Sequence, residues 1–314
     1  MRAAAIVVNH NGGADLARCL EALFAQSVAI EVVLVDCAST DGSRRLADEP
    51  PPGVRGLPLP DNRGFAGGVN AGLAALGDEV EVVGVFNPDC FPSPELFAVC
   101  LELFGRASGV GGVAPRLVRD DGVTLDSCGQ VLTPWLLRVC DRGYGEPAAG
   151  AWGEPGRVLA ACGAGMVYRR SALAAAAVDG EVMPSAFFAF WEDLDLGWRV
   201  SNLGLEVRYE PRAVAVHRRA ATAAPGSGRL LFRRPPGLQA HILANRWATL
   251  ARNLHAVDFL VRLPVLLMAD AAMVALVVAR RPAVARPLLA ALPGVARAWR
   301  QRRAVPRRRL RELA

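Results

Sequence analysis

The sequence predicts an α/β protein in which a mostly parallel β-sheet is flanked by helices and followed by a helical extension, first apolar and then basic. Three observations predict this. Over the first 120 residues, short apolar runs alternate with helical patterns, the order that gives a parallel sheet covered by helices. Polar residues follow those apolar runs. Residues 280–314 carry eleven Arg and a single acid, Glu312, so this segment has a net charge of +10 and the rest of the chain carries −4 of the total of +6.

Hydrophobic spacing places the elements of the first half. Continuous apolar runs predict buried strands over 4–8, 32–35 and 82–86, with a weaker, proline-interrupted strand over 54–59. Apolar residues at i, i+3, i+4, i+7 and i+8 from Leu16 predict one face of a helix over 16–24. Further helices are predicted over 69–76, after the capping residues 39–41, and from Pro94 as a first helical residue.

The second half is less regular. A strand is predicted over 160–168 and a helix over 187–203, with Gly204 at its C-terminal cap. Two short strands follow over 207–209 and 213–216, and His217 ends the second. Residues 218–237 are rich in Ala, Gly, Pro and Arg and are predicted to form a loop, and the remainder is predicted to be helical.

Composition limits the classes of protein that this chain can belong to. With 314 residues and 52% apolar residues it can bury a sizeable core in one large domain or two modest ones. Its seven cysteines are scattered and form no CxxC, which argues against a disulfide framework or a zinc site. Residues 1–9 lead directly into a strand pattern, so no signal peptide is expected and the predicted location is cytoplasmic. All 36 basic residues are Arg, so no lysine can serve as a phosphate ligand or general base.

Polar residues gather at the predicted strand ends. Asn9, Asp36, the Asp61-Asn62 pair and the Asn87-Pro88-Asp89 triplet each follow an apolar run. Because parallel sheets bind ligands at the carboxyl ends of their strands, these residues are expected to surround a binding crevice. Any one of them could simply occupy an exposed loop, but four together favour a site.

Three further features can carry chemistry. A carboxylate at Asp89 would point into the crevice, and divalent cations that bind a diphosphate take one or two protein carboxylates. In the segment 192–195, the spacing of Asp195 and Arg199 predicts an ordinary i,i+4 ion pair, whereas Asp193 lies off that face and can point into a cleft. His217 lies at a strand end, 24 residues after Asp193, which is enough chain to return to the same crevice.

Taken in order, these segments resemble a known family. Residues 7–11, 33–43, 62–70, 86–89 and 187–199, closed by His217, resemble the inverting family 2 glycosyltransferases of the GT-A fold, and within them the bacterial rhamnosyltransferases. The resemblance covers roughly residues 3–255. It implies a glycosyltransferase domain over 1–255, with a nucleotide-sugar-binding half over 1–120 and an acceptor and catalytic half over 121–255. Residues 256–314 would be a helical, Arg-rich, membrane-associating tail.

The resemblance also implies roles for particular residues. Asp193 would be the general base, supported by Glu192 and Trp191, and Asp89 with His217 would bind Mg²⁺ or Mn²⁺ on the donor diphosphate. The donor nucleotide would be bound by six residues: Asn9, Asp36, Asn62, Gly64, Asn70 and Asn87. Three positions depart from the family pattern. His10 replaces a usual Tyr, Cys37 a usual Asn, and Asn87 the first acid of the usual Asp-x-Asp, which leaves one certain carboxylate for the metal.

The implied reaction is transfer of a sugar from a nucleotide-diphosphate sugar to a glycan hydroxyl, with inversion. The expected donor is dTDP-L-rhamnose, with UDP-galactofuranose as the nearest rival, and the expected acceptor is an oligosaccharide or a polyprenyl-diphosphate-linked glycan. A sugar nucleotidyltransferase is a weaker alternative, because residues 9–14 contain no basic residue. A non-catalytic binding protein is disfavoured because Asp89, Asp193 and His217 are all present. Nucleic-acid binding is disfavoured because the sequence shows no set of aromatic residues on which bases could stack.

The tail suggests a membrane partner. Residues 263–279 are apolar except for Asp270, but seventeen residues fall short of the roughly 20 that a membrane span needs, and an Asp in its middle is costly. A helix lying in the membrane plane, or a helical hairpin with 282–293, is therefore predicted. The Arg run that follows fits an anionic surface, which predicts a peripheral location at the inner face of the plasma membrane. A core helix of the catalytic domain is the alternative.

Overall fold

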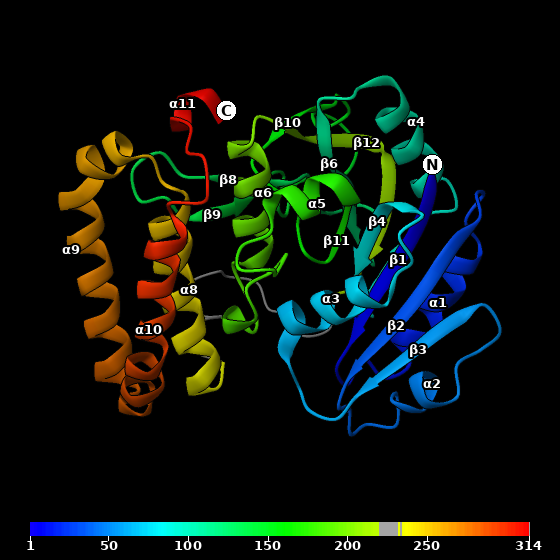
Figure 1. Ribbon diagram of the computed structural model, residues 1–314, viewed down its shortest axis with the longest axis horizontal. Coiled ribbons are helices and arrows are strands. Elements are labelled where there is room, and N and C mark those ends of the chain that lie inside the picture. Colours follow the sequence, from blue (N-terminus) through cyan, green and yellow to red (C-terminus); the bar gives the residue numbers. More distant parts are fainter. Residues whose placement is uncertain (220–231, 233, 314) are drawn as a thin grey trace.

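The computed structural model describes residues 1–219, 232 and 234–313. The described residues form a ten-stranded central sheet with helices on both faces (Figure 1). The sheet order is β10-β12-β6-β11-β4-β1-β2-β3, with β5 added beside β12 and β7 beside β6. The strands of this sheet are β1 (Arg2–Asn9), β2 (Ile30–Cys37), β3 (Val54–Leu59), β4 (Val80–Phe86), β5 (Cys90–Pro92), β6 (Val110–Arg119), β7 (Leu125–Ser127), β10 (Gly156–Val158), β11 (Gly165–Arg169) and β12 (Glu206–His217). A separate pair consists of β8 (Gln130–Leu132) and β9 (Val139–Asp141).

Strands β3, β2, β1 and β4 run parallel, as the sequence predicts. Asn9 pairs in register with Asp36, so the polar ends of β1 and β2 lie side by side. The other half of the sheet is mixed, because β11 runs antiparallel to both β4 and β6, while β6 and β12 are parallel. The parallel half therefore aligns the strand ends that the sequence singled out.

The helices that cover the sheet are α1 (Asp15–Phe24), α2 (Arg45–Asp48), α3 (Gly64–Ala75), α4 (Leu96–Arg106), α5 (Arg170–Ala176) and α6 (Glu192–Asn202). Helix α1 buries four of the five residues on its predicted face, and Phe24 at its end is half exposed. Helix α4 begins at Leu96, two residues later than predicted, and Pro94 lies in the turn before it, where its carbonyl accepts a hydrogen bond from the Ser27 N–H. Each face of the sheet carries its own apolar core.

The predicted helix over 187–203 is interrupted. A short 3₁₀ turn, η1 (Ser185–Phe187), is followed by a turn over 188–191 and only then by α6. Phe188, Phe190 and Trp191 have φ of +59°, +73° and +74°, values that no α-helix can contain. Gly204 follows α6 at φ +89°, in the conformation expected of a helix-terminating glycine.

Two strand predictions in the second half also change. The strand predicted over 160–168 begins only at Gly165, and the two short strands before His217 form one strand, β12, with a bulge between Glu210 and Val214. The predicted loop over 218–237 lies largely outside the described residues, and its end is helical, because α8 begins at Pro236. Among the described residues, no two cysteines form a disulfide, as expected.

The described residues from 234 onward form a largely helical extension whose helices pack together (Figure 1). It consists of α8 (Pro236–Asn253), α9 (Ala256–Arg280), η2 (Pro282–Val284), α10 (Ala285–Gln301) and α11 (Leu310–Leu313). Helices α9 and α10 form the hairpin that was one of the two predicted arrangements. Leu243 of α8, Val277 of α9 and Leu288 of α10 meet in a shared apolar cluster. The division of the chain at residue 255 stays a prediction. Helices α8 and α10, which lie on either side of that residue, pack against each other.

Helix α9 is the one described helix that is long and apolar enough to cross a membrane, judged by length and composition alone. Asp270, the acid in its middle, accepts hydrogen bonds from Arg246 Nε (3.0 Å) and Trp247 Nε1 (3.1 Å) of α8. The charge of Asp270 is therefore neutralised from inside the protein, and the outward face of α9 is left apolar.

Candidate active site

A cavity of about 530 Å³ lies at the carboxyl end of β4, between the two halves of the sheet. Its walls come from segments far apart in the sequence. The residues with chemically useful side chains around it are Asn87, Asp89, Gln130, Asp141, Trp191, Glu192, Asp193, His217 and Arg219. The structure thus brings together five residues that the sequence singled out as catalytic, metal-binding or supporting, and it adds others.

Asp193 stands at the start of α6 with its carboxylate held by three donors. Its Oδ2 accepts hydrogen bonds from the Gly163 backbone N–H (2.8 Å) and from Gln130 Nε2 (2.9 Å), and its Oδ1 accepts one from the Leu194 backbone N–H (2.8 Å). Burial raises the pKa of Asp193 above its ordinary value, although the three hydrogen bonds oppose this rise. A carboxylate held in one orientation with a raised pKa is suited to accept a proton.

Glu192 and Trp191 lie beside Asp193. Glu192 is 6% exposed and its Oε2 has no hydrogen-bond partner among the described residues. Burial, with the neighbouring charge of Asp193, raises the pKa of Glu192 well above its ordinary value. An isolated buried carboxyl of this kind is favoured in its neutral form. Trp191 adopts a left-handed conformation immediately before α6 and lines the cavity.

On another wall of the cavity, Asp89 faces His217. Asp89 Oδ1 lies 3.4 Å from His217 Nε2, and His217 Nδ1 lies 2.7 Å from Oδ2 of the fully buried Asp126. Burial alone would lower the pKa of His217, but the hydrogen bonds to Asp126 and Asp89 outweigh it and raise that pKa to about 9. Burial would raise the pKa of Asp126, yet His217 and Arg219 hold it below its ordinary value. Asp89, His217, Asp126 and Arg219 therefore lie next to one another as alternating acidic and basic side chains.

These residues fit a divalent cation that is shared with a substrate. Asp126 fixes the His217 ring through Nδ1, so Nε2 is directed at the Asp89 carboxylate, and an oriented imidazole of this kind is a common feature of metal sites. In the described part of the chain, no group of three or more His, Cys, Asp or Glu side chains could hold a metal by itself. Two protein ligands with room for phosphate oxygens suit Mg²⁺ or Mn²⁺, which bind through one or two carboxylates plus substrate phosphates.

Several site residues escaped the sequence analysis. Asp126 lies in β7, 91 residues before His217, and no local pattern links the two. Gln130 lies 63 residues before Asp193. Arg219 binds Asp126 and also lies near Asp141, with Nη2–Oδ2 at 3.4 Å. Its position two residues after His217 was a usable signal, since a cation beside a proposed diphosphate site has an evident role.

The residues assigned to the donor nucleotide are placed differently from one another. Asn87 lines the cavity. Asn9 and Asp36 are fully buried and do not line it. Asn9 Nδ2 donates to Asp36 Oδ2 (2.7 Å), Ser39 Oγ (3.1 Å) and Ser43 Oγ (2.9 Å). In this structure the Asn9 amide holds together the loops that follow β1 and β2, and its contact with the nucleotide stays a prediction.

The remaining three donor residues also make contacts within the protein. Asn62 Oδ1 accepts a hydrogen bond from the Gly64 N–H (2.9 Å), and a Cβ on Gly64 would lie 2.3 Å from the Phe188 carbonyl oxygen. The glycine is thus required by an approach of protein backbone. Asn70 accepts a hydrogen bond from the Met183 N–H (3.1 Å) and donates one to its carbonyl (2.6 Å), so it ties α3 to the segment that precedes η1. In this structure neither Gly64 nor Asn70 lines the cavity, and their contact with the donor nucleotide stays a prediction.

Two departures from the family pattern contact each other, because His10 Nδ1 lies 2.8 Å from the carbonyl oxygen of Cys37. The predicted ion pair of Asp195 and Arg199 is present, with Oδ2–Nε at 2.9 Å and both side chains buried. Asp195 therefore turns away from the cavity that Asp193 lines.

Comparison with known proteins agrees with this arrangement. Residues 4–174, more than half of the chain, match the Glycosyl transferase family 2 profile. The chain is 29% identical over 240 residues to the N-acetylglucosaminyl-diphospho-decaprenol L-rhamnosyltransferase of Mycobacterium tuberculosis (strains CDC 1551 / Oshkosh and ATCC 25618 / H37Rv), and the match covers 68% of this chain and 75% of the relative.

Two solved structures share the fold. The mannosyltransferase PcManGT from Pyrobaculum calidifontis has a TM-score of 0.55 at 20% identity, and the match covers 99% of this chain and 85% of that one. GalNAc-T7 has a TM-score of 0.57 at 14% identity over 82% of this chain, which spans only 48% of the GalNAc-T7 chain. The fold is GT-A-like, and with the family profile spanning most of the catalytic sheet, the chain is a member of glycosyl transferase family 2.

Proposed function

We propose that this glycosyltransferase moves a sugar, with dTDP-L-rhamnose as the preferred donor, to a hydroxyl of a polyprenyl-diphosphate-linked glycan, with inversion. The observation that carries the proposal is one cavity that holds Asp193 on one wall and the Asp89–His217 pair on another. The similarity to an enzyme named as an L-rhamnosyltransferase of N-acetylglucosaminyl-diphospho-decaprenol supports this choice of donor and acceptor.

In this proposal Asp193 removes the proton of the incoming acceptor hydroxyl. Its three hydrogen bonds fix the carboxylate, so that the base is in place before the acceptor arrives. The new bond to the anomeric carbon forms as the bond to the donor diphosphate breaks. The transition state resembles an oxocarbenium ion, as in glycoside hydrolysis. A single displacement of this kind inverts the anomeric centre.

The other wall would receive the leaving diphosphate. Asp89 and His217 would hold a divalent cation, which when bound offsets negative charge on a diphosphate. Arg219 lines the same cavity and adds a fixed positive charge there. Structures of the two GT-A-like neighbours are described with Mn²⁺, together with GDP-Man in one and with UDP and GalNAc in the other, which supports this assignment.

We propose further that the C-terminal hairpin places the enzyme on an anionic membrane surface at the inner face of the plasma membrane. Leu260, Val261, Leu267 and Met268 of α9 are each at least 55% exposed and recur at a seven-residue spacing, so they share one face of the helix. The Arg-rich α10 and the residues after it supply positive charge in the same extension. Apolar contact plus cationic side chains is the combination that binds peripheral proteins to anionic leaflets.

A panel of sugar nucleotides tests the proposed reaction. Purified protein with Mn²⁺ and a synthetic polyprenyl-diphosphate glycan is incubated with dTDP-L-rhamnose, UDP-galactofuranose and other donors, and the nucleoside diphosphate released is quantified. We expect release to depend on the acceptor and to be greatest with dTDP-L-rhamnose, and NMR of the product to show an inverted anomeric centre. Greater release with UDP-galactofuranose would favour that rival. Formation of inorganic diphosphate from a sugar phosphate and a nucleoside triphosphate would favour a nucleotidyltransferase.

A further inference from the structure

The turn that precedes α6 is held in a conformation that its sequence does not favour. Phe188, Phe190 and Trp191 all have positive φ although none is glycine. Such backbone is uncommon outside glycine and persists only where surrounding contacts enforce it. This turn leads directly into Glu192 and Asp193. The contacts that enforce its shape therefore also determine the position of the Asp193 backbone, from which the carboxylate extends.

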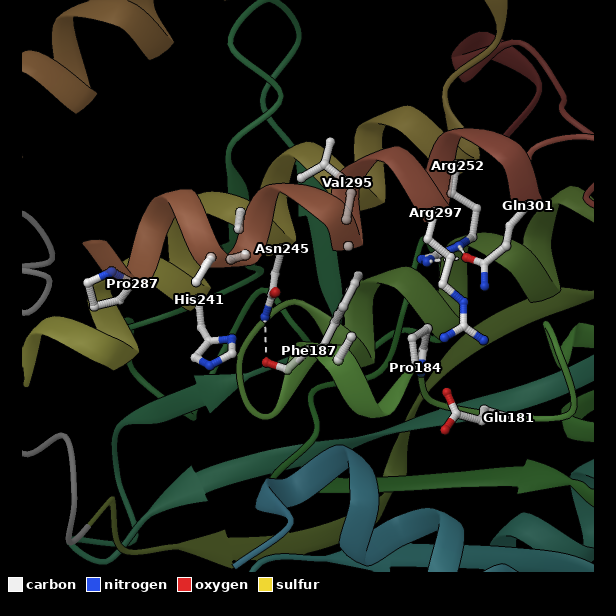
Figure 2. A pocket seen from close by; sticks show the side chains of 16 residues that line it. Glu181, Pro184, Phe187, His241, Asn245, Arg252, Pro287, Val295, Arg297 and Gln301 are labelled. Carbon is white, nitrogen blue, oxygen red and sulfur yellow. Dashed lines mark hydrogen bonds between the residues drawn. The ribbon is translucent and has the colours of Figure 1, made fainter. Parts of the chain in front are cut away.

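One side chain of α8 enforces it from the extension. Asn245 Nδ2 lies within hydrogen-bond distance of the carbonyl oxygens of Phe187 (2.8 Å), Ala189 (3.1 Å) and Phe190 (2.8 Å), which share its two N–H groups, and Asn245 is 3% exposed. Figure 2 shows this amide reaching from α8 to the Phe187 carbonyl, beside His241. Three carbonyl groups facing one position can be satisfied only by a donor, which explains an amide there.

The opposite side of the turn is fixed by the nucleotide-binding half. The Ala66 N–H donates to the Phe188 carbonyl (3.2 Å), and Gly64 leaves the room that this carbonyl needs. The Phe188 ring stacks on His241 of α8, with centroids 5.5 Å apart. The turn is therefore clamped between α3 and α8, and each of the carbonyls of 187–190 has a partner in the described structure.

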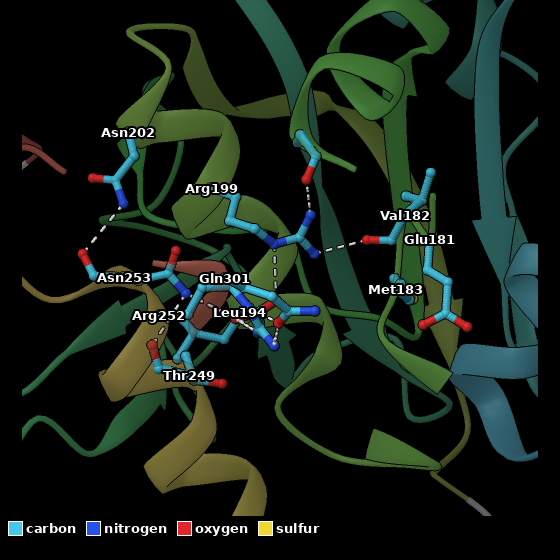
Figure 3. Close-up of polar contacts among 12 residues, drawn as sticks. Glu181, Val182, Met183, Leu194, Arg199, Asn202, Thr249, Arg252, Asn253 and Gln301 are labelled. Atoms are coloured by element: carbon cyan, nitrogen blue, oxygen red, sulfur yellow. Dashed lines mark hydrogen bonds and ion pairs between the residues drawn. The ribbon is translucent and has the colours of Figure 1, made fainter. Parts of the chain in front are cut away.

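The far part of α6 is attached to the extension by different contacts. Asp195 accepts hydrogen bonds from Arg199 within α6 and from Arg252 and Asn253 of α8. Arg252 also donates to Gln301 of α10, and Figure 3 shows these two side chains together with Arg199 and Asn253. The side chains of this network hold α6 against α8, and in the described structure none of them donates a hydrogen bond to a carbonyl of the 188–191 turn; Arg252 lies over the Phe187 ring, 5.3 Å from its centroid. Asn245 and the Asp195 network consequently have separable effects, one on the turn and the other on the attachment of the helix.

We propose that Asn245 is a positioning residue that sets the orientation of Asp193 by holding the 188–191 turn. The inference rests on the proposed role of Asp193 as the base. Asn245 belongs to α8 of the extension, so through this residue the extension contributes to the placement of Asp193.

The test compares Asn245→Ala with Asn202→Ala. Asn202 is a matched control because it is also buried, at 2% exposure, and also joins α6 to the C-terminal region, through the Asn253 carbonyl (3.3 Å) and the Arg308 N–H (3.0 Å). It lies at the opposite end of α6 from Asp193. The measurements are kcat, the donor Kd by calorimetry with Mn²⁺, and thermal unfolding. ¹⁹F NMR of 5-fluorotryptophan-labelled protein adds a readout of structure, with the Trp191 signal assigned through Trp191→Phe.

We expect Asn245→Ala to lower kcat by about a hundredfold, the scale of a misplacement of roughly 1 Å, with the donor Kd little changed and the Trp191 signal shifted. Asn202→Ala should lower the unfolding temperature to a similar extent and leave kcat and the Trp191 signal near wild type. If Asn245→Ala does not fold, Asn245→Ser, which keeps one donor, decides in its place and should show a smaller kcat loss of the same pattern.

Two results would overturn the inference: equal kcat losses in the two variants, or an unmoved Trp191 signal in Asn245→Ala. Failure of the proposed function is distinguishable from both. If Asp193→Asn keeps full activity, or no donor is turned over, the base assignment is wrong, while the ¹⁹F comparison still reports whether Asn245 holds the turn.

Discussion

Asp193 and Asp195 of α6 are only two residues apart, but the same Asp→Asn substitution should lower kcat at Asp193 and the free energy of unfolding at Asp195. Asp195 is fully buried and lies against two guanidinium groups, those of Arg199 and Arg252, which are 1% and 2% exposed. Replacing its carboxylate by an amide leaves both cations buried without their counter-charge. Removing one partner of a buried ion pair costs about 3–5 kcal/mol. We therefore expect Asp195→Asn to lower the free energy of unfolding by about that amount.

For Asp193 the loss should be catalytic. Its carboxylate accepts three hydrogen bonds and has no cation paired with it among the described residues, so an amide can keep two of the bonds through one oxygen. Losing one hydrogen bond costs about 1 kcal/mol. An amide cannot accept the acceptor's proton, however, and general-base catalysis contributes about 10²–10⁴-fold. Asp193→Asn should lower kcat by that factor with the donor Kd nearly unchanged.

Thermal unfolding and steady-state transfer kinetics, measured on the same preparations, separate the two effects. A loss of 3–5 kcal/mol should lower the unfolding temperature of Asp195→Asn on the order of 10 °C. Its kcat per folded molecule, with folded protein counted by donor binding, should remain well above that of Asp193→Asn. Severe and equal kcat losses in both variants would refute the division into a base and a structural acid.

Four further outcomes are expected. Asp89→Ala, or a strong chelator added to wild type, should abolish transfer and the binding of Mn²⁺ with nucleoside diphosphate in calorimetry; activity that survives chelation would reduce Asp89 to a turn residue. Glu192→Gln should keep most of the wild-type kcat, because the raised pKa already favours a neutral group there; a severe loss, with a mild effect at Asp193, would move the base by one residue. The kcat–pH profile should fall at low pH with an apparent pKa above the ordinary Asp value of about 3.9, since Asp193 acts only when deprotonated and burial raises its pKa; a profile that is flat down to that value would contradict this. The double variant Leu267→Glu/Met268→Glu should no longer pellet with anionic phosphatidylglycerol vesicles, whereas Val123→Glu, an exposed apolar residue on the sheet domain, should pellet like wild type; retained pelleting of the double variant would place the membrane contact elsewhere.

The parts of the fold that could be predicted are those encoded by local spacing. The strands over 4–8 and 32–35 and the buried face of α1 follow from apolar periodicity, and the structure places them as expected. The ion pair of Asp195 and Arg199 follows from i,i+4 spacing. Asp89 and His217 could be placed at one crevice because Asp89 follows β4 and His217 ends β12, two strands of the same sheet.

The parts that could not be predicted depend on contacts between distant segments. Nothing in the residues 188–191 signals positive φ, because Phe and Trp rarely adopt it, and the apolar spacing there continues a helical pattern. The turn exists because Ala66 and Asn245, which come from two other helices, satisfy its carbonyl groups. Asp126 is invisible for the same reason, since only the sheet brings β7 to His217.

The role of the C-terminal extension follows from the same long-range contacts. Its composition suggests a tail that could be removed to release the enzyme from a membrane. In the structure, however, Gln301 of α10 accepts hydrogen bonds from Arg252, the residue that neutralises Asp195, and Leu288 of α10 packs into the apolar cluster that covers α8. Removing α9 and α10 would expose α8 and leave Arg252 with one partner fewer, so truncation cannot separate membrane binding from folding. Single side chains on the outward face of α9 can separate them, because Leu267 and Met268 are more than 60% exposed. The surface proposed to meet the membrane and the helix that holds the 188–191 turn therefore belong to one packed unit, in which α8 lies between α9 and the turn that precedes Asp193.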